Sequence, residues 1–467
     1  MTILLSLLLF SLFLQTSEPV DPVALEWFHK GEELIGTDQE NSRQQAEFFE
    51  KAVELAPDLA VARFNLALVY IRQERPRLAL VQLDELIELD QTDPRGYLLR
   101  ARLRFEANQL DPAASDLDRA LELDPENYQA WQFRGRVHYQ RQQYAEAVKA
   151  FEAVLERNPS LVEAFFDLAL SQQASGQAQV AIKSYQRFLL AFPEDFQAHY
   201  LLGLAYRDER QGDLALEQLQ IAERIDPSHK ELSQELGNLL LDRGDLEEAQ
   251  MRLLRADPES AANLGNLGII AKRQGDPAQA ESYLRRGLEK EPDNAALWIQ
   301  LGEVFSAQQK EREAVEAYQR ALRYKPRDFG TLLNLGTLLF NLDQAKQARR
   351  LLEQAVEVNP DDGLANYNLA LVLDEAKDLD QAQVRYLKAL DHGVDSAHAH
   401  FRLTYLWARQ GAKEQALEHL QQAFEKEAET YVRLAAEELL QVSSDWDSIR
   451  YTDEFNQLLE QYWDRME

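Results

Sequence analysis

The chain has 467 residues, of which 45% are hydrophobic and 28% are charged. This balance is ordinary for a chain that buries a core, and it excludes wholesale disorder. The 50 Lys and Arg against 80 Asp and Glu give a net charge of −30, whereas a protein that binds nucleic acid needs a large cationic face, so no nucleic-acid partner is expected. The absence of cysteine excludes disulfides, thiolate zinc sites and a cysteine nucleophile.

The first seventeen residues differ from the rest of the chain. Residues 3–14 are Leu, Ile and Phe, interrupted only by Ser6 and Ser11, and no charged residue lies between Thr2 and Ser17. An apolar run of this length is typical of a signal peptide and short for a membrane span of about 20 residues. Residues 1–17 are therefore expected to direct export, to the bacterial periplasm or cell envelope. The alternatives are an uncleaved N-terminal membrane anchor and an apolar start without a targeting role, because no Lys or Arg precedes the run and no clear cleavage site follows it.

A period of 34 residues organises the remaining chain. Alanine lies twelve residues before most of the periodic positions, and a Leu-Gly or Leu-Ala pair, such as Leu301-Gly302, lies upstream of it in most units. The step between the two main series of prolines is 31, so one repeat is three residues short. These prolines are Pro125, Pro159, Pro193 and Pro227 in the first series and Pro258, Pro292, Pro326 and Pro360 in the second.

These positions resemble the tetratricopeptide-repeat (TPR) family from about Val23 to Ala428, and twelve repeats can be counted. The resemblance implies an all-α fold, a right-handed α-solenoid superhelix in which each repeat is a pair of helices and the first helices line a concave groove. The residues agree, because apolar side chains recur at helical spacing and Asp-Pro pairs are suited to start helices. Four glycines fit the left-handed stop between paired helices: Gly176, Gly244, Gly275 and Gly411.

The repeats are expected to fall into two groups. Repeats 1–7 would occupy residues 18–257 and end with the shortened repeat, and repeats 8–12 would occupy residues 258–428, with a changed stacking angle near 250–262. The first repeat has about two extra residues between its helices, at 36–41, and is expected to be an N-terminal cap.

Residues 429–467 leave the repeat frame and resemble the end-of-group segment that closes many bacterial TPR arrays. Trp446, Ile449, Phe455 and Leu458 are expected to cover the last exposed face as a C-terminal cap. A tail that docks a partner is the alternative.

No residue pattern points to catalysis. A serine nucleophile elbow, a phosphate-binding glycine loop and a His-Glu-x-x-His motif are all absent. Among the scattered histidines only His392, His398 and His400 lie near one another in sequence, and the last two should point to different sides of a helix. We therefore expect no catalytic residue, no metal site, no cofactor and no enzymatic activity.

An amide precedes the Leu-Gly or Leu-Ala pair in several repeats, and this place is called the amide position below. Because a carboxamide both donates and accepts hydrogen bonds, a row of them could hold a peptide main chain without reading its sequence. The row resembles the asparagine ladder of peptide-binding TPR superhelices, although Asn is common there in the family whatever the function. The candidates are Asn65, Asn266, Gln300, Asn334 and Asn368.

Aromatic side chains recur one residue earlier. Exposed aromatics along a groove favour burial against a partner, and packing between neighbouring first helices is the alternative. The candidates are Phe64, Phe166, Tyr200, Tyr367 and Phe401, with Leu333 in the same row.

A local group of arginines interrupts the acidic chain in repeats three and four. It could receive a carboxylate or an acidic segment, or its guanidinium groups could pair with nearby residues such as Asp116 and Asp118. The lysines of the family's co-chaperone carboxylate clamp are missing, so chaperone-tail recognition is not expected. The anion-binding candidates are Arg100, Arg102, Arg104, Arg134 and Arg136.

The sequence thus predicts a non-catalytic interaction scaffold of the cell envelope that binds peptide or protein segments in its groove. Two alternatives stay open: a structural or assembly subunit of an envelope export or secretion machine, which could include a membrane-anchored complex, and an accessory subunit that presents substrates to a separate enzyme. The partner, its pathway and the oligomeric state are not predicted.

Overall fold

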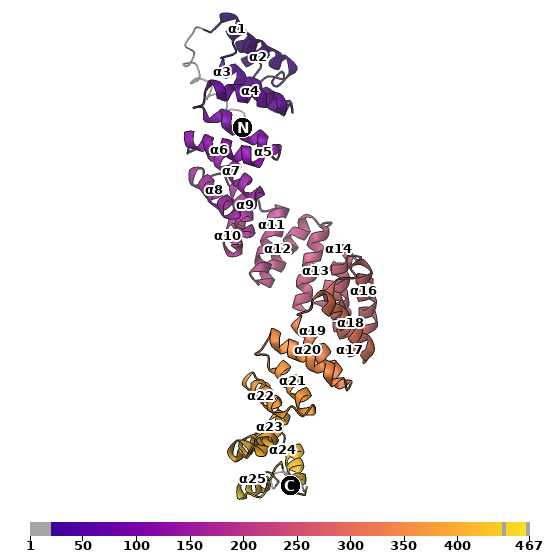
Figure 1. Ribbon diagram of the computed structural model, residues 1–467. Coiled ribbons are helices and arrows are strands. Elements are labelled where there is room, and N and C mark those ends of the chain that lie inside the picture. The colour runs from indigo at the N-terminus through magenta and orange to yellow at the C-terminus, as the bar shows by residue number, and fades with distance from the viewer. Residues whose placement is uncertain (1–19, 441–444, 464–467) are drawn as a thin grey trace. The chain divides into compact units, whose positions relative to one another are not determined.

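The computed structural model describes residues 20–440 and 445–463, so the predicted signal segment 1–17 lies outside the described residues. Every regular element within them is a helix (Figure 1), and none of these helices is long and apolar enough to cross a bilayer. The all-α solenoid predicted from the sequence is confirmed, because helices of 11 to 14 residues follow one another in pairs through the repeats.

The chain forms two compact units, residues 1–232 (unit 1) and 233–467 (unit 2). The sequence analysis divides the repeats later, at 257/258, where the period shortens, and that division stays a prediction. The helices of unit 1 are α1 (Pro22–Glu32), α2 (Arg43–Leu55), α3 (Ala60–Arg72), α4 (Pro76–Leu89), α5 (Pro94–Glu106), α6 (Leu110–Leu123), α7 (Tyr128–Gln140), α8 (Tyr144–Arg157), α9 (Ala164–Ala174), α10 (Ala178–Ala191), α11 (Phe196–Asp208) and α12 (Gly212–Ile225).

Helix α13 (Lys230–Arg243) contains the boundary between the units, and its residues from Ser233 onward belong to unit 2. The further helices of unit 2 are α14 (Leu246–Ala256), α15 (Ala261–Arg273), α16 (Pro277–Lys290), α17 (Ala295–Ala307), α18 (Glu311–Tyr324), α19 (Phe329–Asn341), α20 (Ala345–Val358), α21 (Gly363–Glu375), α22 (Leu379–Asp391), α23 (Ala397–Arg409), α24 (Lys413–Leu440) and α25 (Asp453–Trp463).

The first helix of most repeats begins at a polar capping residue. Asp195, Asn294 and Asp362 lie directly before their helices and accept a hydrogen bond from a backbone N–H of the first turn. Such a cap satisfies one of the four N–H groups that the helix start leaves unpaired and is worth about 1 kcal/mol.

A left-handed residue ends the first helix of each repeat. In the turn after α17 it is Gln309, with φ of 59°, and the N–H of Lys310 then donates to the carbonyl of Phe305 at 2.9 Å. This is the six-residue Schellman closure. The predicted Gly176, Gly244, Gly275 and Gly411 all adopt the left-handed conformation. At the equivalent place seven repeats carry another residue: Glu74, Asn108, Gln142, Arg210, Gln309, Asp343 and Lys377.

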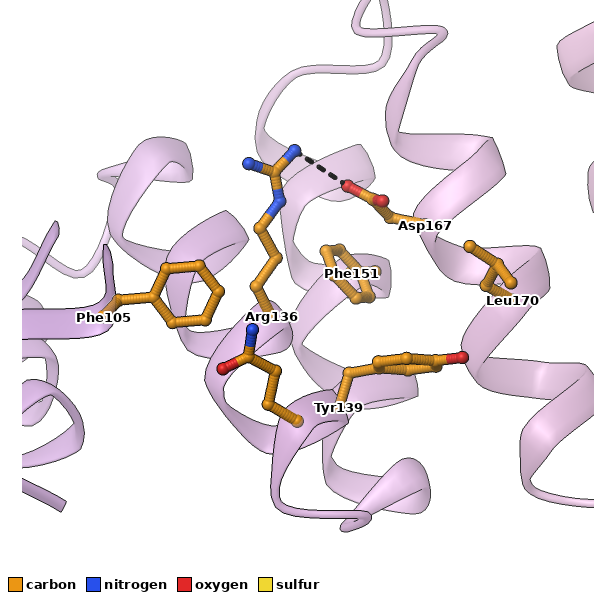
Figure 2. A pocket seen from close by; sticks show the side chains of 7 residues that line it. Phe105, Arg136, Tyr139, Phe151, Asp167 and Leu170 are labelled. Atoms are coloured by element: carbon orange, nitrogen blue, oxygen red, sulfur yellow. Dashed lines mark hydrogen bonds and ion pairs between the residues drawn. The ribbon is translucent and has the colours of Figure 1, made fainter. Parts of the chain in front are cut away.

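The paired helices approach closely where the first helix carries a small residue. A Cβ added at Gly302 would lie 2.6 Å from Cε1 of Tyr318, and one at Gly135 would lie 2.7 Å from Cζ of Phe151. Both rings are almost fully buried, so the absence of a side chain on the first helix makes room for the ring. Phe151 also forms part of the wall of a cavity in unit 1 (Figure 2).

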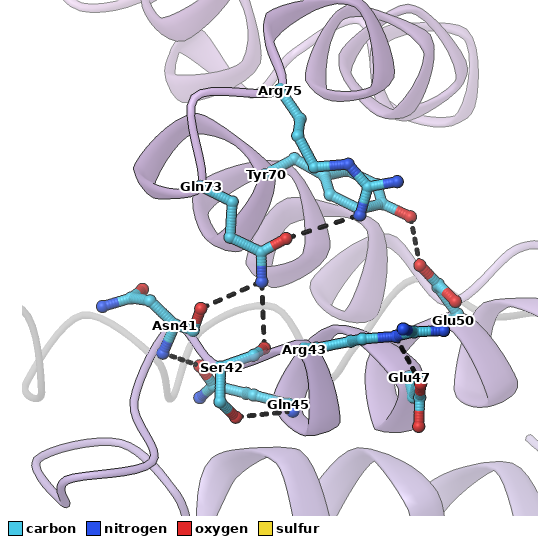
Figure 3. A network of polar contacts seen from close by, with 9 residues as sticks. All are labelled: Asn41, Ser42, Arg43, Gln45, Glu47, Glu50, Tyr70, Gln73 and Arg75. Carbon is cyan, nitrogen blue, oxygen red and sulfur yellow. Dashed lines mark hydrogen bonds and ion pairs between the residues drawn. The ribbon is translucent and has the colours of Figure 1, made fainter.

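The first repeat closes its longer inter-helix turn with side-chain amides (Figure 3). Gln73 of the next repeat donates from Nε2 to the carbonyls of Asn41 and Ser42, both at 2.9 Å. Gln45 accepts from the N–H of Asn41 at 2.6 Å. These bonds satisfy backbone groups that the extra residues at 36–41 would otherwise leave exposed, and they tie this turn to the following repeat.

The shortened repeat has lost residues from its second helix. Helix α14 has 11 residues where α12 has 14. Its buried residues are Ala249, Leu253 and Ala256, with the same spacing as Ala215, Leu219 and Ala222 of α12. The buried face is therefore retained, and about one turn is missing.

The C-terminal segment packs on the last repeat. Helix α24 bends at Glu427, where φ is −151°, so residues beyond it leave the direction of the repeat helix. Trp446, Ile449 and Phe455 are buried in a cluster with side chains of α23 and α24, and Leu458 packs against that cluster. This contact covers apolar surface that a further repeat would otherwise bury.

Candidate functional site

The first helices contact one another within each unit. In unit 1, α5 lies against α7 and α7 against α9, and in unit 2, α15 lies against α17 and α19 against α21. First helices of successive repeats are thus direct neighbours. A residue at one repeat position can therefore reach a side chain of the preceding first helix, and the amide position shows this.

Two amides of unit 2 are hydrogen-bonded to the preceding first helix. The Asn266 Nδ2 donates to Oδ1 of Asn238 at 2.7 Å. The Asn368 Nδ2 donates to Oγ1 of Thr337 at 2.8 Å, and this Asn is only 9% exposed. Each of these bonds uses one N–H of the carboxamide and fixes the direction in which the rest of it points.

The other three predicted amides differ. Asn334 is exposed. The Nδ2 of Asn65 and the Oε1 of Gln300 are buried and have no hydrogen-bond partner among the described residues. A buried polar group without a partner costs about 1–3 kcal/mol, so these two atoms mark places where a further hydrogen-bonding group would be stabilising.

The aromatic row is half-buried and packs on other side chains of the chain. Phe166 lies 5.2 Å from Phe188, measured between ring centroids, and Phe401 lies 5.0 Å from Tyr431. Tyr200 lies 5.6 Å from the ring of His229. The guanidinium of Arg95 lies 5.1 Å from the ring of Phe64, and Tyr367 contacts Tyr386 at 6.1 Å. These contacts favour the packing alternative, although part of each ring stays accessible.

The arginines of repeats three and four face carboxylates. Arg100 and Arg104 share Asp116, with nitrogen–oxygen distances of 2.7 Å each, and Asp116 is only 3% exposed. Arg100 also pairs with Asp84 at 2.8 Å. A buried carboxylate held by two guanidinium groups is a structural arrangement, because removal of either cation leaves the other in place.

The remaining three arginines form more exposed pairs. Arg102 pairs with Glu106 at 2.9 Å, Arg134 with Asp118 at 3.0 Å and Arg136 with Asp167 at 3.2 Å. Exposed ion pairs contribute about 0–1 kcal/mol. A ligand carboxylate could therefore displace these partners more readily than it could displace Asp116.

A polar cluster in unit 2 escaped the sequence analysis. Arg402 donates from Nε and Nη2 to the two oxygens of Asp374, both at 2.6 Å, in the bidentate geometry typical of strong pairs. Tyr386 donates to the same carboxylate at 3.2 Å. Burial, and then the charge of Asp374, raise the pKa of Tyr386 far above its ordinary value, so the hydroxyl stays protonated. The one available signal was Arg402 itself, which stands at the amide position.

His398 and His400 lie on different sides of α23, as predicted. His398 Nδ1 lies 3.2 Å from the hydroxyl of Tyr367, and burial, followed by the charge of Arg402, lowers the pKa of His398. His400 Nδ1 instead lies 2.8 Å from Nδ1 of His419 on α24. Among the residues that the structure describes, no group of three or more His, Cys, Asp and Glu has a geometry that could hold a metal ion.

A second recurrent contact was also missed. The side chain six residues after the periodic proline bonds back to that proline's carbonyl in several repeats, as Trp131 does to Pro125 at 2.9 Å and Trp298 to Pro292 at 2.8 Å. Arg63, His199 and Asn366 make the same contact. Because five residue types share this role, no sequence motif reveals it.

Comparison with family models supports the repeat architecture. Models of the tetratricopeptide repeat match residues 98–161 and 166–230 and residues 264–296. The model described as the cytochrome c-type biogenesis protein H TPR domain matches residues 281–397. Comparison with curated protein sequences gives no significant match.

Several solved structures are similar to this chain in fold. Yeast Tom70 is 15% identical, with 91% of this chain and 100% of that chain covered and a TM-score of 0.40. PilF of Pseudomonas aeruginosa is 21% identical, with 44% and 97% covered and a TM-score of 0.41. A MamA fragment from Desulfovibrio magneticus RS-1 is 23% identical, with 36% and 96% covered and a TM-score of 0.35. The matched family models and the helix pairs repeating every 34 residues lead to one conclusion: the chain belongs to the tetratricopeptide-repeat family.

Proposed function

We propose that this chain is a non-catalytic scaffold that binds extended peptide or protein segments along its first helices, through main-chain contacts with the amides. The observation that carries the proposal is the pair of unsatisfied atoms at the amide position, Nδ2 of Asn65 and Oε1 of Gln300. One is a donor and the other an acceptor, as the N–H and C=O groups of a bound main chain require.

The hydrogen-bonded amides support the same function. Asn266 and Asn368 each use one N–H on the preceding first helix, while a carboxamide offers two donors and an acceptor oxygen. A side chain fixed in this way loses little conformational entropy when it binds a ligand, because its rotamer is already selected. The exposed Asn334 between them is accessible to a main chain without any rearrangement.

We also propose that the protein is exported to a bacterial envelope, either released after cleavage or held by its N-terminal segment. The apolar run at residues 3–14 supports this location. A strongly acidic chain is repelled by anionic lipid surfaces, so the N-terminal segment would supply any attachment to the membrane.

The test is affinity capture from envelope extract of the native host, with the wild-type chain and the variant Asn266→Ala/Asn334→Ala/Asn368→Ala in parallel. A groove-bound partner should be held at least about tenfold more weakly by the variant, because three hydrogen bonds of about 0.5–1.5 kcal/mol each are removed. Binding at unchanged affinity would refute main-chain recognition by these amides.

Matched controls separate binding from folding. Asn341→Ala/Asn359→Ala removes exposed amides of unit 2 away from the amide position and should leave capture unchanged. Asn334→Ala alone changes an exposed side chain, so its effect on affinity does not depend on core packing. Circular dichroism melting of all variants checks that the repeats remain folded.

A second candidate is a subunit of an envelope assembly machine, in which the partner binds outside the first helices. The match of residues 281–397 to the TPR domain of a cytochrome c-type biogenesis protein supports it. Stoichiometric co-purification with a membrane complex, equal for the wild type and the triple variant, is the outcome expected of that role. Turnover of a substrate by the purified chain alone would contradict both candidates.

A further inference from the structure

Unit 1 contains a small cavity on its first helices (Figure 2). Its wall comes from Phe105 of α5, Tyr139 and Gln140 of α7, Phe151 of α8 and Leu170 of α9, with Arg136 and Asp167 beside it. The cavity volume is about 180 Å³. It therefore joins three successive repeats, on the helices that the proposed function assigns to ligand binding.

The size and lining of the cavity suit one aromatic ring. An apolar protein cavity of about 150 Å³ is large enough to bind benzene. Here the rings of Phe105, Tyr139 and Phe151 and the side chain of Leu170 supply the apolar surface. Rings in such a site gain from edge-to-face contacts beyond the area that they bury, by about 0.5–1.5 kcal/mol.

The charge beside the cavity favours an anion. Helices α5 and α7 carry six arginines and one glutamate between them, in a chain whose net charge is −30. Arg136 lines the cavity and pairs with Asp167 at 3.2 Å, and their side chains are 43% and 24% exposed. Because so exposed a pair is weak, a carboxylate of a ligand can take the place of Asp167 on this guanidinium.

We propose that the cavity receives the aromatic side chain of a bound protein segment and that Arg136 pairs with a carboxylate next to that ring. The inference rests on the proposed function for the nature of the ligand, and it adds the chemistry that the amides do not read. The amides bind a main chain of any sequence, whereas the cavity selects segments with Phe, Tyr or Trp beside Asp, Glu or a terminal carboxylate.

Three small probes test this recognition on the full chain by ligand-observed NMR titration. The first is 3-phenylpropanoate, which carries a ring and a carboxylate; the second is its neutral amide; the third is butanoate, which lacks the ring. Saturable binding should be tightest for 3-phenylpropanoate, weaker for the amide and absent for butanoate. Absence of saturable binding of 3-phenylpropanoate, or equal affinity for all three probes, would overturn the proposal.

Two charge variants should act in opposite directions. Arg136→Gln should weaken 3-phenylpropanoate about fivefold, the equivalent of about 1 kcal/mol, and leave the neutral amide unchanged. Asp167→Asn removes the competing carboxylate and should tighten 3-phenylpropanoate by a similar factor. A weakening by Asp167→Asn would contradict the role of Arg136.

A third variant tests the cavity itself. Leu170→Trp places a larger side chain on the cavity wall and should abolish binding of both ring-bearing probes, with retention of the helical circular dichroism spectrum and of the melting temperature as the control for folding. Retained ring binding in a folded Leu170→Trp chain would place the probe elsewhere and refute the assignment.

The source of the carboxylate is separated by two further ligands. An acetylated peptide amide with Phe next to Asp carries an internal carboxylate, and acetyl-phenylalanine carries a terminal one. Binding of either supports the proposal and names the source; binding of neither, with the ring probes bound, refutes a protein segment as the occupant.

The amide variant distinguishes a failure of this inference from a failure of the proposed function. All three residues of Asn266→Ala/Asn334→Ala/Asn368→Ala lie in unit 2, so the variant should bind 3-phenylpropanoate as the wild type does. Loss of the probe in the amide variant would contradict a separate site in unit 1.

Discussion

The two units present different chemistry at the same repeat position. In unit 1 the residue before the small-residue pair is Leu99, Phe133, Asp167 or Leu201, with the amide Asn65 at the N-terminal end. In unit 2 four successive repeats carry Asn266, Gln300, Asn334 and Asn368. The helix pairs, the caps and the left-handed turns are alike in both units. The comparison teaches that the 34-residue frame fixes where a side chain stands, while the residue at that place decides what kind of contact it makes.

The largest expected effect comes from the buried carboxylates, which the two units hold differently. Asp116 in unit 1 has two arginine partners, and Asp374 in unit 2 has Arg402 alone. Arg402→Met should lower the free energy of unfolding by about 3 kcal/mol, because a buried charge loses its only cation. Arg104→Met should cost about 1 kcal/mol, since Arg100 remains on Asp116.

Urea unfolding of the full chain, followed by far-UV circular dichroism, measures both losses. Equal losses for the two variants would show that the number of cations does not decide the stability of the carboxylate. Arg402→Lys is the control, because it keeps the charge of unit 2 and gives up the bidentate geometry.

A smaller effect comes from a pair that titrates in unit 2 alone. His400 and His419 stand where His199 and Gln218 stand in unit 1, and in each pair the ring nitrogen lies within hydrogen-bond distance of the partner. Burial, and then the charge of His400, lower the pKa of His419 to about 4, and Glu418 opposes this shift. Between about pH 6.5 and pH 4 the unfolded chain binds a proton at His419 that the folded chain does not bind.

Stability should therefore fall as the pH falls through that window, by about 2 kcal/mol in total, and be fully present above it. His419→Gln copies the pair of unit 1 and should remove this part of the acid sensitivity. Urea midpoints at pH 7 and pH 4.5 give the comparison, and an identical pH dependence in wild type and variant would exclude His419 as its source.

The smallest effect concerns a feature that the units share. Lys377 in unit 2 and Glu74 in unit 1 have φ of 61° and 57°, in the left-handed region where a side chain is unfavourable. Lys377→Gly and Glu74→Gly should each stabilise the chain by about 0.5–1 kcal/mol, because relief of the backbone cost outweighs the greater freedom of glycine in the unfolded chain. Thermal melting should show similar gains in both units, and Gly176→Ala should show a loss. A loss for either glycine variant would mean that its side chain contributes more than the turn costs.

The fold was largely predictable, because the information that fixes it is local and repeated. Asp and Asn caps, small residues in the first helix and one left-handed residue every 34 positions define each helix pair without reference to distant residues. The candidate site was less predictable. Whether an amide has a partner depends on the preceding first helix, as Asn238 does for Asn266, and the cavity in unit 1 needs walls from three repeats. Such neighbours are set by stacking, which the sequence pattern of one repeat does not contain.

The shortened helix α14 shows how much variation the repeat tolerates. Its deletion of three residues nearly equals the 3.6 residues of one α-helical turn, so the remaining side chains keep their rotational phase about the helix axis. Loss of one residue, or of two, would turn the apolar face by about 100° or 200° and expose it to solvent. Repeat length in this chain can therefore change in quantised steps of about one turn. Insertions or deletions engineered in whole turns at the end of a second helix offer a way to adjust the spacing of binding surfaces while the core is preserved.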